Sequence, residues 1–150
     1  MKAVVQRVSR ASVTVDNSIV GKIDRGLLIL LGVQEGDTQE DLEWLSTKIS
    51  KMRIFSDAGG KMNLAVQEVK GRVLVVSQFT LLASTKKGNR PSYDNSAKPD
   101  IAKKIYEDFC IKMEELLNDK IERGIFAADM KVELLNDGPV TIIIDSKNRE

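Results

Sequence analysis

The sequence predicts an α+β fold with a mostly antiparallel, barrel-like β-sheet and two main helices, in a single domain spanning residues 1–150. Three observations support it. Strand patterns fill the first third before any helical pattern, two amphipathic stripes of helical spacing follow, and no repeat or composition break divides the chain. With 150 residues, 42% of them hydrophobic, the chain can bury one core without disulfides or structural metal.

The first third is expected to form short strands. Residues 11–16 alternate apolar and polar side chains, which is typical of a half-exposed strand. Asp16 and Asn17 favour a turn, after which residues 19–23 return as a second strand. The continuous apolar run at 27–31 lies between two glycines and predicts a strand buried on both faces.

Two later segments have helical periodicity. Thr38 and Asp41 are spaced as a helix cap, with Asp in place of the usual Glu. The apolar stripe of this helix consists of Leu42, Leu45, Ile49 and Met52. The second helix is expected to begin near Pro99 and to stop at Gly124. Its stripe consists of Ile101, Ile105, Phe109, Met113 and Leu116.

The remaining segments predict strands and one long loop. Residues 73–76 are apolar, mostly β-branched and predict a strand that ends in the polar cluster 77–80. Residues 86–99 predict a long surface loop, because they are polar and contain glycine and proline. Residues 130–144 predict two further strands, separated by a turn at 136–139.

The composition excludes several kinds of chemistry. The chain has no histidine, so the usual general base, the usual zinc ligand and every Ser-His or Cys-His nucleophile are missing. Its single cysteine, Cys110, is expected to pack a helix rather than to react. No segment resembles a calcium loop or a Walker-type phosphate loop. We therefore expect neither a metal nor a cofactor.

Charge and hydropathy limit the possible partners. A formal net charge of +1 offers little of the basic field of a protein that coats nucleic acid, so RNA contact should be local and no DNA partner is expected. The N-terminus has no long apolar signal segment, and no apolar stretch approaches membrane-spanning length. We expect a cytoplasmic protein without a membrane partner.

Three clusters suggest a function, and each also has a plain structural interpretation. Residues 77–80 place two hydroxyls and an amide at a strand end, where they either converge on a small substrate or cap a turn. Residues 136–141 favour a hairpin turn, although Pro139 removes a backbone donor at the mouth of an apolar strand. The loop 86–93 combines three cations with an aromatic ring, which suits a phosphate and a base, or a solvated surface loop.

The chain resembles the D-aminoacyl-tRNA deacylase family from its first residues almost to its last. The motifs that match in order and spacing are Val5-Gln6-Arg7-Val8 with Ala11-Ser12-Val13, Ser77-Gln78-Phe79-Thr80-Leu81, Lys87-Gly88-Asn89-Arg90-Pro91-Ser92, and Asn136-Asp137-Gly138-Pro139-Val140-Thr141. Two departures occur, since Ala127 stands where glycine is expected and Tyr93 where phenylalanine is expected.

The resemblance implies a homodimer that hydrolyses the ester of D-aminoacyl-tRNA, with active sites at the subunit interface. Gly138 and Pro139, joined by a cis peptide bond, would enter the pocket of the other subunit. Their carbonyl oxygens would face the α-amino group and chiral centre of the substrate, so an L side chain would meet rigid backbone while a D side chain points away. Such rejection tolerates many amino acids, and cleavage of glycyl-tRNA is left open.

The resemblance also implies catalytic roles. The backbone N–H groups of Phe79 and Thr80, with the side chain of Gln78, would orient the ester and stabilise the oxyanion. Thr80 is a possible nucleophile, but its motif holds no base that would activate it. We therefore favour assistance by the ribose 2′-hydroxyl of the terminal adenosine.

Binding roles follow from the same resemblance. Ser77 would lie beside the substrate, and Arg7 and Met130 near the adenosine or the cross-subunit motif. The acceptor-stem phosphates would contact Lys86, Lys87 and Arg90. Two other interpretations remain: a non-catalytic protein of the same fold that binds the tRNA end, and a hydrolase of other acyl esters or amides with Thr80 as nucleophile.

Overall fold

The computed structural model describes the chain from Met1 to Glu150. Its strands are β1 (Lys2–Val15), β2 (Ser18–Ile23), β3 (Gly26–Gly32), β4 (Phe55–Ser56), β5 (Met62–Leu64), β6 (Arg72–Ser77), β7 (Glu122–Arg123) and β8 (Lys131–Asp145). Its helices are α1 (Gln39–Ser50) and α2 (Pro99–Leu117), with a short 3-10 turn at Phe79–Leu82. The predicted α+β architecture with two main helices is confirmed. No helix is both long enough and apolar enough to cross a membrane.

The main sheet is built around β1. This strand pairs with β3 through its first half, with β2 through its second half and with β8 along most of its length, always antiparallel. The pairs β3 with β6 and β6 with β7 are parallel, so the sheet is mixed. The sheet rolls until β2 approaches β7, where a Cβ on Gly21 would lie 2.8 Å from the carbonyl oxygen of Arg123. Glycine at this position permits the nearly closed, barrel-like form.

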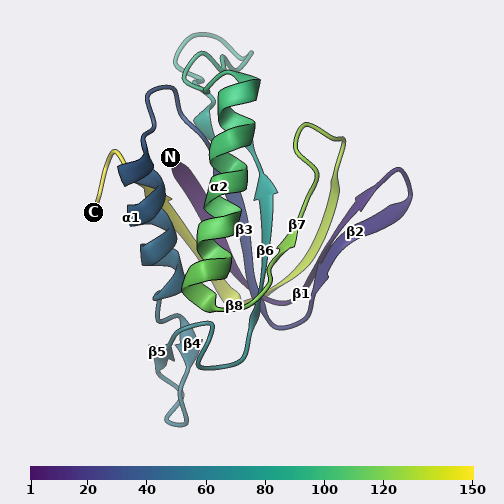
Figure 1. Ribbon diagram of the computed structural model, residues 1–150, viewed down its shortest axis with the longest axis vertical. Helices are drawn as coiled ribbons and strands as arrows, with labels where there is room; N and C mark the ends of the chain where they lie inside the picture. Colours follow the sequence, from purple (N-terminus) through teal and green to yellow (C-terminus); the bar gives the residue numbers. More distant parts are fainter.

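Two apolar cores stabilise this arrangement. Figure 1 shows α1 and α2 side by side on one face of the sheet. Most of the stripes expected for the helices are buried against the sheet, including Leu42, Leu45 and Ile49 of α1 and Phe109 and Met113 of α2. The ends of the second stripe are wrong, because Ile101 is 45% exposed and Leu117 rather than Leu116 is buried. A smaller core fills the roll of the sheet and consists of Val8, Ala11, Val13, Ile23, Leu28, Leu74 and Val76.

Two predicted boundaries are wrong. The first strand begins at Lys2 rather than at residue 11, because the preceding segment also pairs with β3 and β8. The second helix ends at Leu117 rather than at Gly124. Asn118 adopts the left-handed conformation with φ 48°, and its N–H caps the last helical carbonyls. Gly124 instead donates its N–H to Val75 and continues the sheet.

The predicted turn at residues 136–139 is also wrong. Both flanking segments belong to the single strand β8 and run in the same direction along β1. Two register shifts in β1, between Gln6 and Val8 and between Val8 and Arg10, absorb the extra residues as a bulge. The turn-forming sequence therefore makes an irregular point within a strand.

Candidate active site

The polar cluster at the end of β6 is held by the sheet next to it. Ser77 is the last residue of β6 and pairs with Leu31 of β3, whose carbonyl oxygen also accepts the N–H of Gln78 at 2.8 Å. The chain then enters the 3-10 turn that begins at Phe79. As the first residues of this turn, Phe79 and Thr80 have no acceptor within it for their N–H groups, and neither N–H makes a turn, loop or side-chain hydrogen bond. Two adjacent backbone donors are thus free to bind a developing negative charge.

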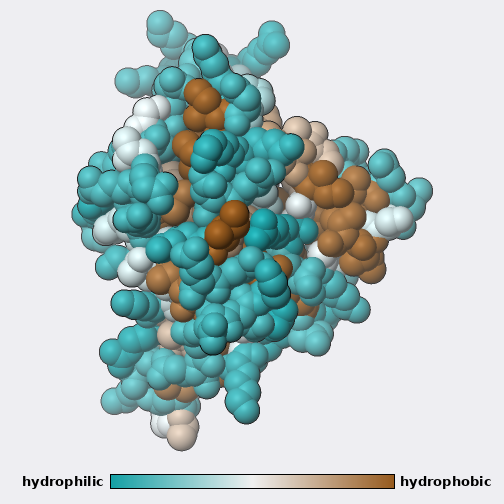
Figure 2. All heavy atoms as spheres, in the orientation of Figure 1, coloured by the Kyte–Doolittle hydropathy of each residue, from teal (hydrophilic) through white to brown (hydrophobic).

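A cavity of about 640 Å³ opens beside this turn. One wall comes from Ser77, Gln78 and Phe79, and the opposite wall from the connection between β7 and β8, residues 126–130. The third wall is the segment that leads into α2, from Ser96 to Pro99. Most lining residues are hydrophobic, and Figure 2 shows hydrophobic side chains gathered on the side of the β7–β8 connection. This is the size and character of a site for a small organic group.

The cavity contains little acid–base chemistry. Its ionisable side chains are Lys98, Asp129 and Tyr93, and the carboxylate of Asp129 is paired with Lys131 at 2.8 Å. The hydroxyl oxygen of Thr80 accepts a hydrogen bond from Nε2 of Gln78 at 2.5 Å, and no ionisable group binds it. The site therefore offers donors for an oxyanion but no base placed to activate Thr80.

Aromatic rings line the mouth of the cavity. Phe79 is 54% exposed, and its ring meets that of Tyr93 edge-on, with 5.0 Å between the centroids and 67° between the planes. Tyr93, noted in the sequence as the aromatic ring of its loop and as a departure from the family's phenylalanine, lines the cavity beside Phe79. An exposed aromatic pair at a pocket mouth suits stacking against a planar ring.

The connection between β7 and β8 bears on one departure from the family pattern. Ala127 has φ 62°, in the left-handed region where glycine is favoured, which accounts for the glycine expected at this position. Met130 is a half-buried lining residue of the same wall.

The Gly138–Pro139 motif lies away from this cavity. Its peptide bond is cis, as the resemblance implies, and both residues are exposed. Gly138 lies against Arg7 of β1, since a Cβ built on it would be 2.6 Å from Nη2 of Arg7. Ser77 lies beside Leu31 of β3, which pairs with Ala3 of β1. Arg7 and Ala3 are four residues apart on β1, which corresponds to about 13 Å along the strand. The chain therefore does not bring this motif to its own cavity.

Arg7 fixes the bulge rather than lining the cavity. Its Nε donates to the carbonyl oxygen of Asp137 at 3.1 Å, and its Nη1 donates to that of Ile54 at 2.7 Å. A Cβ built on Gly138, which has φ 122°, would lie 2.6 Å from Nη2 of Arg7. Only glycine fits here without a shift of the guanidinium.

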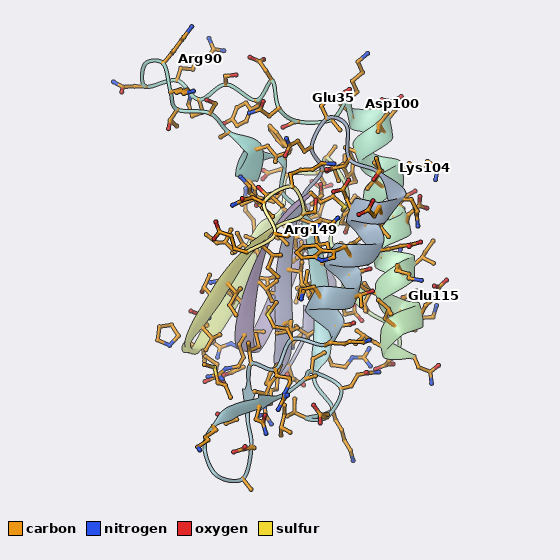
Figure 3. All side chains as sticks on the ribbon, turned by 90° about the vertical axis from the view of Figure 1, so that its left-hand side faces the viewer. Glu35, Arg90, Asp100, Lys104, Glu115 and Arg149 are labelled. Atoms are coloured by element: carbon orange, nitrogen blue, oxygen red, sulfur yellow. The ribbon has the colours of Figure 1, made fainter.

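Three of the predicted tRNA-binding cations lie on the loop that follows the 3-10 turn. Lys86, Lys87 and Arg90 are exposed, and Figure 3 shows Arg90 on a loop that extends beyond the end of the sheet. None of them forms an ion pair, in contrast to the paired lysines on α2 such as Lys104. Lys98 lines the cavity, is also unpaired, and was missed in the sequence because nothing local marks it.

Other reactive groups are structural. Cys110 is fully buried, and burial raises the pKa of its thiol to about 12, which agrees with the packing role predicted for it. No cluster of three or more His, Cys, Asp or Glu side chains is arranged to hold a metal ion.

Comparisons with known proteins agree with one another. The family model described as D-Tyr-tRNA(Tyr) deacylase matches residues 4–145. Proteins named D-aminoacyl-tRNA deacylase from Flavobacterium psychrophilum and Parabacteroides distasonis are 59% and 57% identical over 150 residues, with all of each chain covered.

Solved structures show the same similarity. One described as "c-Myc DNA Unwinding Element Binding Protein" has a TM-score of 0.92 and 41% identity, covering 97% of this chain and 98% of that one. Another, described as a probable eukaryotic D-amino acid tRNA deacylase, has a TM-score of 0.80 at 16% identity, covering 95% of this chain and 97% of that one, and indicates the fold alone.

Proposed function

Because this chain belongs to the D-Tyr-tRNA(Tyr) deacylase family, we propose that it hydrolyses the ester bond of D-aminoacyl-tRNA and releases the free D-amino acid and the tRNA. The chain is then an enzyme, a carboxylic ester hydrolase that proofreads the chirality of aminoacyl-tRNA. The observation that carries the proposal is the pair of free N–H groups at Phe79 and Thr80, beside an apolar cavity of about 640 Å³.

The proposed chemistry depends on placement rather than on a side-chain base. Water adds to the ester carbonyl carbon, and the carbonyl oxygen becomes an oxyanion that the N–H groups of Phe79 and Thr80 stabilise. The bond to the ribose oxygen then breaks, and that oxygen takes up the proton that the attacking water has released. Since no base meets Thr80, we assign the assisting role to the neighbouring ribose hydroxyl of the substrate. Gln78 holds the Thr80 hydroxyl and orients this edge of the site.

Selection against L-aminoacyl groups needs a second subunit in this proposal. The carbonyl groups of Gly138 and Pro139 would face the chiral centre, but these residues lie at the far end of the strands from their own cavity. A homodimer resolves this, because the motif of one subunit can enter the cavity of its partner. Each site would then combine both chains.

Exposed apolar surface supports the dimer. β8 is an edge strand of 15 residues that pairs only with β1. Ile143 of β8 is 70% exposed and is paired with Val4, which in turn is paired with Leu30, so a row of apolar side chains crosses the sheet. The helices lie on the opposite face, where Ala3 and Val5 are buried. An uncovered apolar face of this kind favours burial against a second copy.

The tRNA itself is proposed to meet the cations of the loop after the 3-10 turn and Lys98 of the cavity wall. Lys86, Lys87 and Arg90 have no acidic partner, so their charge is available to acceptor-stem phosphates. Lys98, which lines the cavity, would bind the phosphate nearest the terminal nucleotide. The aromatic pair Phe79 and Tyr93 offers a face for its base. We propose that this occurs in the cytoplasm and requires neither metal nor cofactor.

The test is to incubate the protein with matched D-tyrosyl-tRNA and L-tyrosyl-tRNA, with and without chelator, and to follow the loss of each ester. We expect rapid hydrolysis of the D form alone, unaffected by chelator. Binding without cleavage of either form would favour the tRNA-end-binding protein, and equal cleavage of both would overturn chiral rejection. Adding duplex DNA as competitor tests the expectation that DNA is not a partner, which the DNA-binding name of one structural neighbour makes worth measuring.

A further inference from the structure

The side chain of Asn136 spans the bulge that carries Gly138 and Pro139. Its Nδ2 donates to the carbonyl oxygen of Arg7 on β1 at 3.0 Å and to that of Val140 on β8 at 2.9 Å. One amide nitrogen thus ties the chain before the motif to the chain after it, and both to the neighbouring strand. The side chain is half-buried, which limits competition from water.

These two hydrogen bonds from Asn136 matter because the pairing of β1 with β8 is interrupted at the bulge. Asn136 pairs with Val8 and Thr141 pairs with Gln6, and no residue between them has a partner in register. The direction of the backbone at residues 137–140 is therefore set by side chains. Arg7 holds the carbonyl of Asp137, and Asn136 holds that of Val140. The carbonyl groups of Gly138 and Pro139 lie between these two fixed points.

We propose that Asn136 is a positioning residue that sets the direction of the Gly138 and Pro139 carbonyl groups and thereby the D-over-L selectivity of the enzyme. This inference rests on the proposed function and adds to it a residue outside the cavity. Asn136 does not touch the substrate. It acts by holding the bulge, which in the proposed dimer enters the cavity of the partner subunit.

The residue type fits the role. The NH2 group supplies two protons from one atom, so it can serve two carbonyl oxygens at once. A carboxylate of the same shape would place a negative oxygen against both carbonyl groups and would repel them. Alanine would leave both carbonyl groups without this donor and the bulge with only the hydrogen bonds from Arg7.

The experiment compares Asn136→Asp with a matched control, Gln67→Glu. Gln67 also donates its side-chain amide to a backbone carbonyl, that of Leu117, at 2.5 Å and away from the motif. Both changes remove an amide donor and add a carboxylate. For each protein, kcat/KM is measured on D-tyrosyl-tRNA and on L-tyrosyl-tRNA, and folding is followed by thermal unfolding.

We expect Asn136→Asp to lower the ratio of D to L cleavage by about 10- to 100-fold, because a displaced motif both positions the ester less well and rejects the L side chain less well. Gln67→Glu should keep the wild-type ratio. If Asn136→Asp fails to fold, Asn136→Ala, which adds no charge, is measured instead with the same expectation. A purely structural role would lower both rates together with the folded fraction and leave the ratio unchanged, and that result would overturn the inference.

The wild-type protein separates this inference from the proposed function. If the wild-type enzyme prefers the D form and the Asn136 variants keep the same ratio of D to L cleavage, only the role of Asn136 is contradicted. A wild-type protein without stereochemical preference removes the proposed function and this inference with it.

Discussion

The side-chain amide of Gln78 donates a hydrogen bond to the hydroxyl oxygen of Thr80, with 2.5 Å between Nε2 and Oγ1. The Thr80 oxygen is therefore engaged as an acceptor, and no ionisable group is placed to remove its proton. This arrangement orients a hydroxyl but does not activate it. The consequences for catalysis can be measured directly.

Thr80→Ala should keep measurable activity, with kcat lowered about tenfold or less, because the backbone N–H of residue 80 is unchanged. A D-aminoacyl-tRNA whose terminal ribose lacks the free 2′-hydroxyl should be deacylated about 10²-fold or more slowly by the wild-type enzyme. Such a loss is expected when a group that assists proton transfer is removed. Single-turnover deacylation measures both. Complete loss in Thr80→Ala, with normal folding and tRNA binding, would point to Thr80 as the nucleophile.

Gly138→Ala should abolish most of the activity. The new Cβ would lie 2.6 Å from Nη2 of Arg7 and 2.9 Å from Cγ2 of Val140, at a φ of 122°. Displacing the bulge by about 1 Å is expected to cost about 10²-fold in rate. Gly60→Ala is the control, since Gly60 has φ 77° but nothing within 4 Å of a Cβ. It should lose some stability, measured by urea unfolding, and keep its activity.

Replacing Lys86, Lys87 and Arg90 together with alanine should raise KM for tRNA substrates of all sequences. The dependence of kcat/KM on salt should also flatten, by about one unit of slope for each phosphate that the variant no longer binds. Lys98→Ala should raise KM as well. Lys112, which is paired with Glu115 on α2, provides the control substitution. A deacylation rate insensitive to salt in the wild type would contradict the role of these cations.

Asp41→Asn should destabilise the protein at neutral pH by about 1–3 kcal/mol. Asp41 accepts hydrogen bonds from the N–H of Thr38 at 2.9 Å and from Nζ of Lys147 at 2.6 Å. Burial by itself would raise the pKa of Asp41, but these hydrogen bonds outweigh it and hold the pKa well below the ordinary 3.8.

Because the pKa of Asp41 is lower in the folded than in the unfolded state, its stabilisation is present above the unfolded value and is lost as the pH falls through the acid range. Urea unfolding of wild type and Asp41→Asn should therefore differ at pH 7 and converge at low pH. The control is Asp108→Asn, whose exposed pairing with Lys104 should contribute little at either pH. A constant difference at all pH values would refute this account.

Ala127→Gly should be as stable as the wild type, or more stable by up to about 1 kcal/mol, because glycine removes the strain of a side chain at φ 62°. Ala83 has φ −59°, so Ala83→Gly should instead lose about 0.5–1 kcal/mol. Thermal unfolding compares the two. Equal losses at both positions would mean that Ala127 carries no strain.

Sequence patterns predicted the parts of this protein that depend on local chemistry. The stripes of α1 and α2 follow the helical period, and the Thr38–Asp41 cap forms because its donor and acceptor lie three residues apart. The polar end of β6 was likewise recognisable, since a buried apolar run stops there. Family motifs then pointed to the reaction and to the cis bond at Gly138.

What the sequence could not determine is how distant segments meet. The residues at 136–139 favour a turn, yet pairing with β1 keeps them in one strand, because regular hydrogen bonds on both sides of the bulge outweigh a local preference. Lys98 and Tyr93 join the cavity only because α2 packs beside the end of β6. The sequence by itself therefore determined the helices, the strand end and the motifs, each governed by neighbours along the chain. The cavity, its unpaired cations and the hydrogen bonds of Arg7 and Asn136 around Gly138 were decided by tertiary structure, because they involve residues that only the folded sheet brings together.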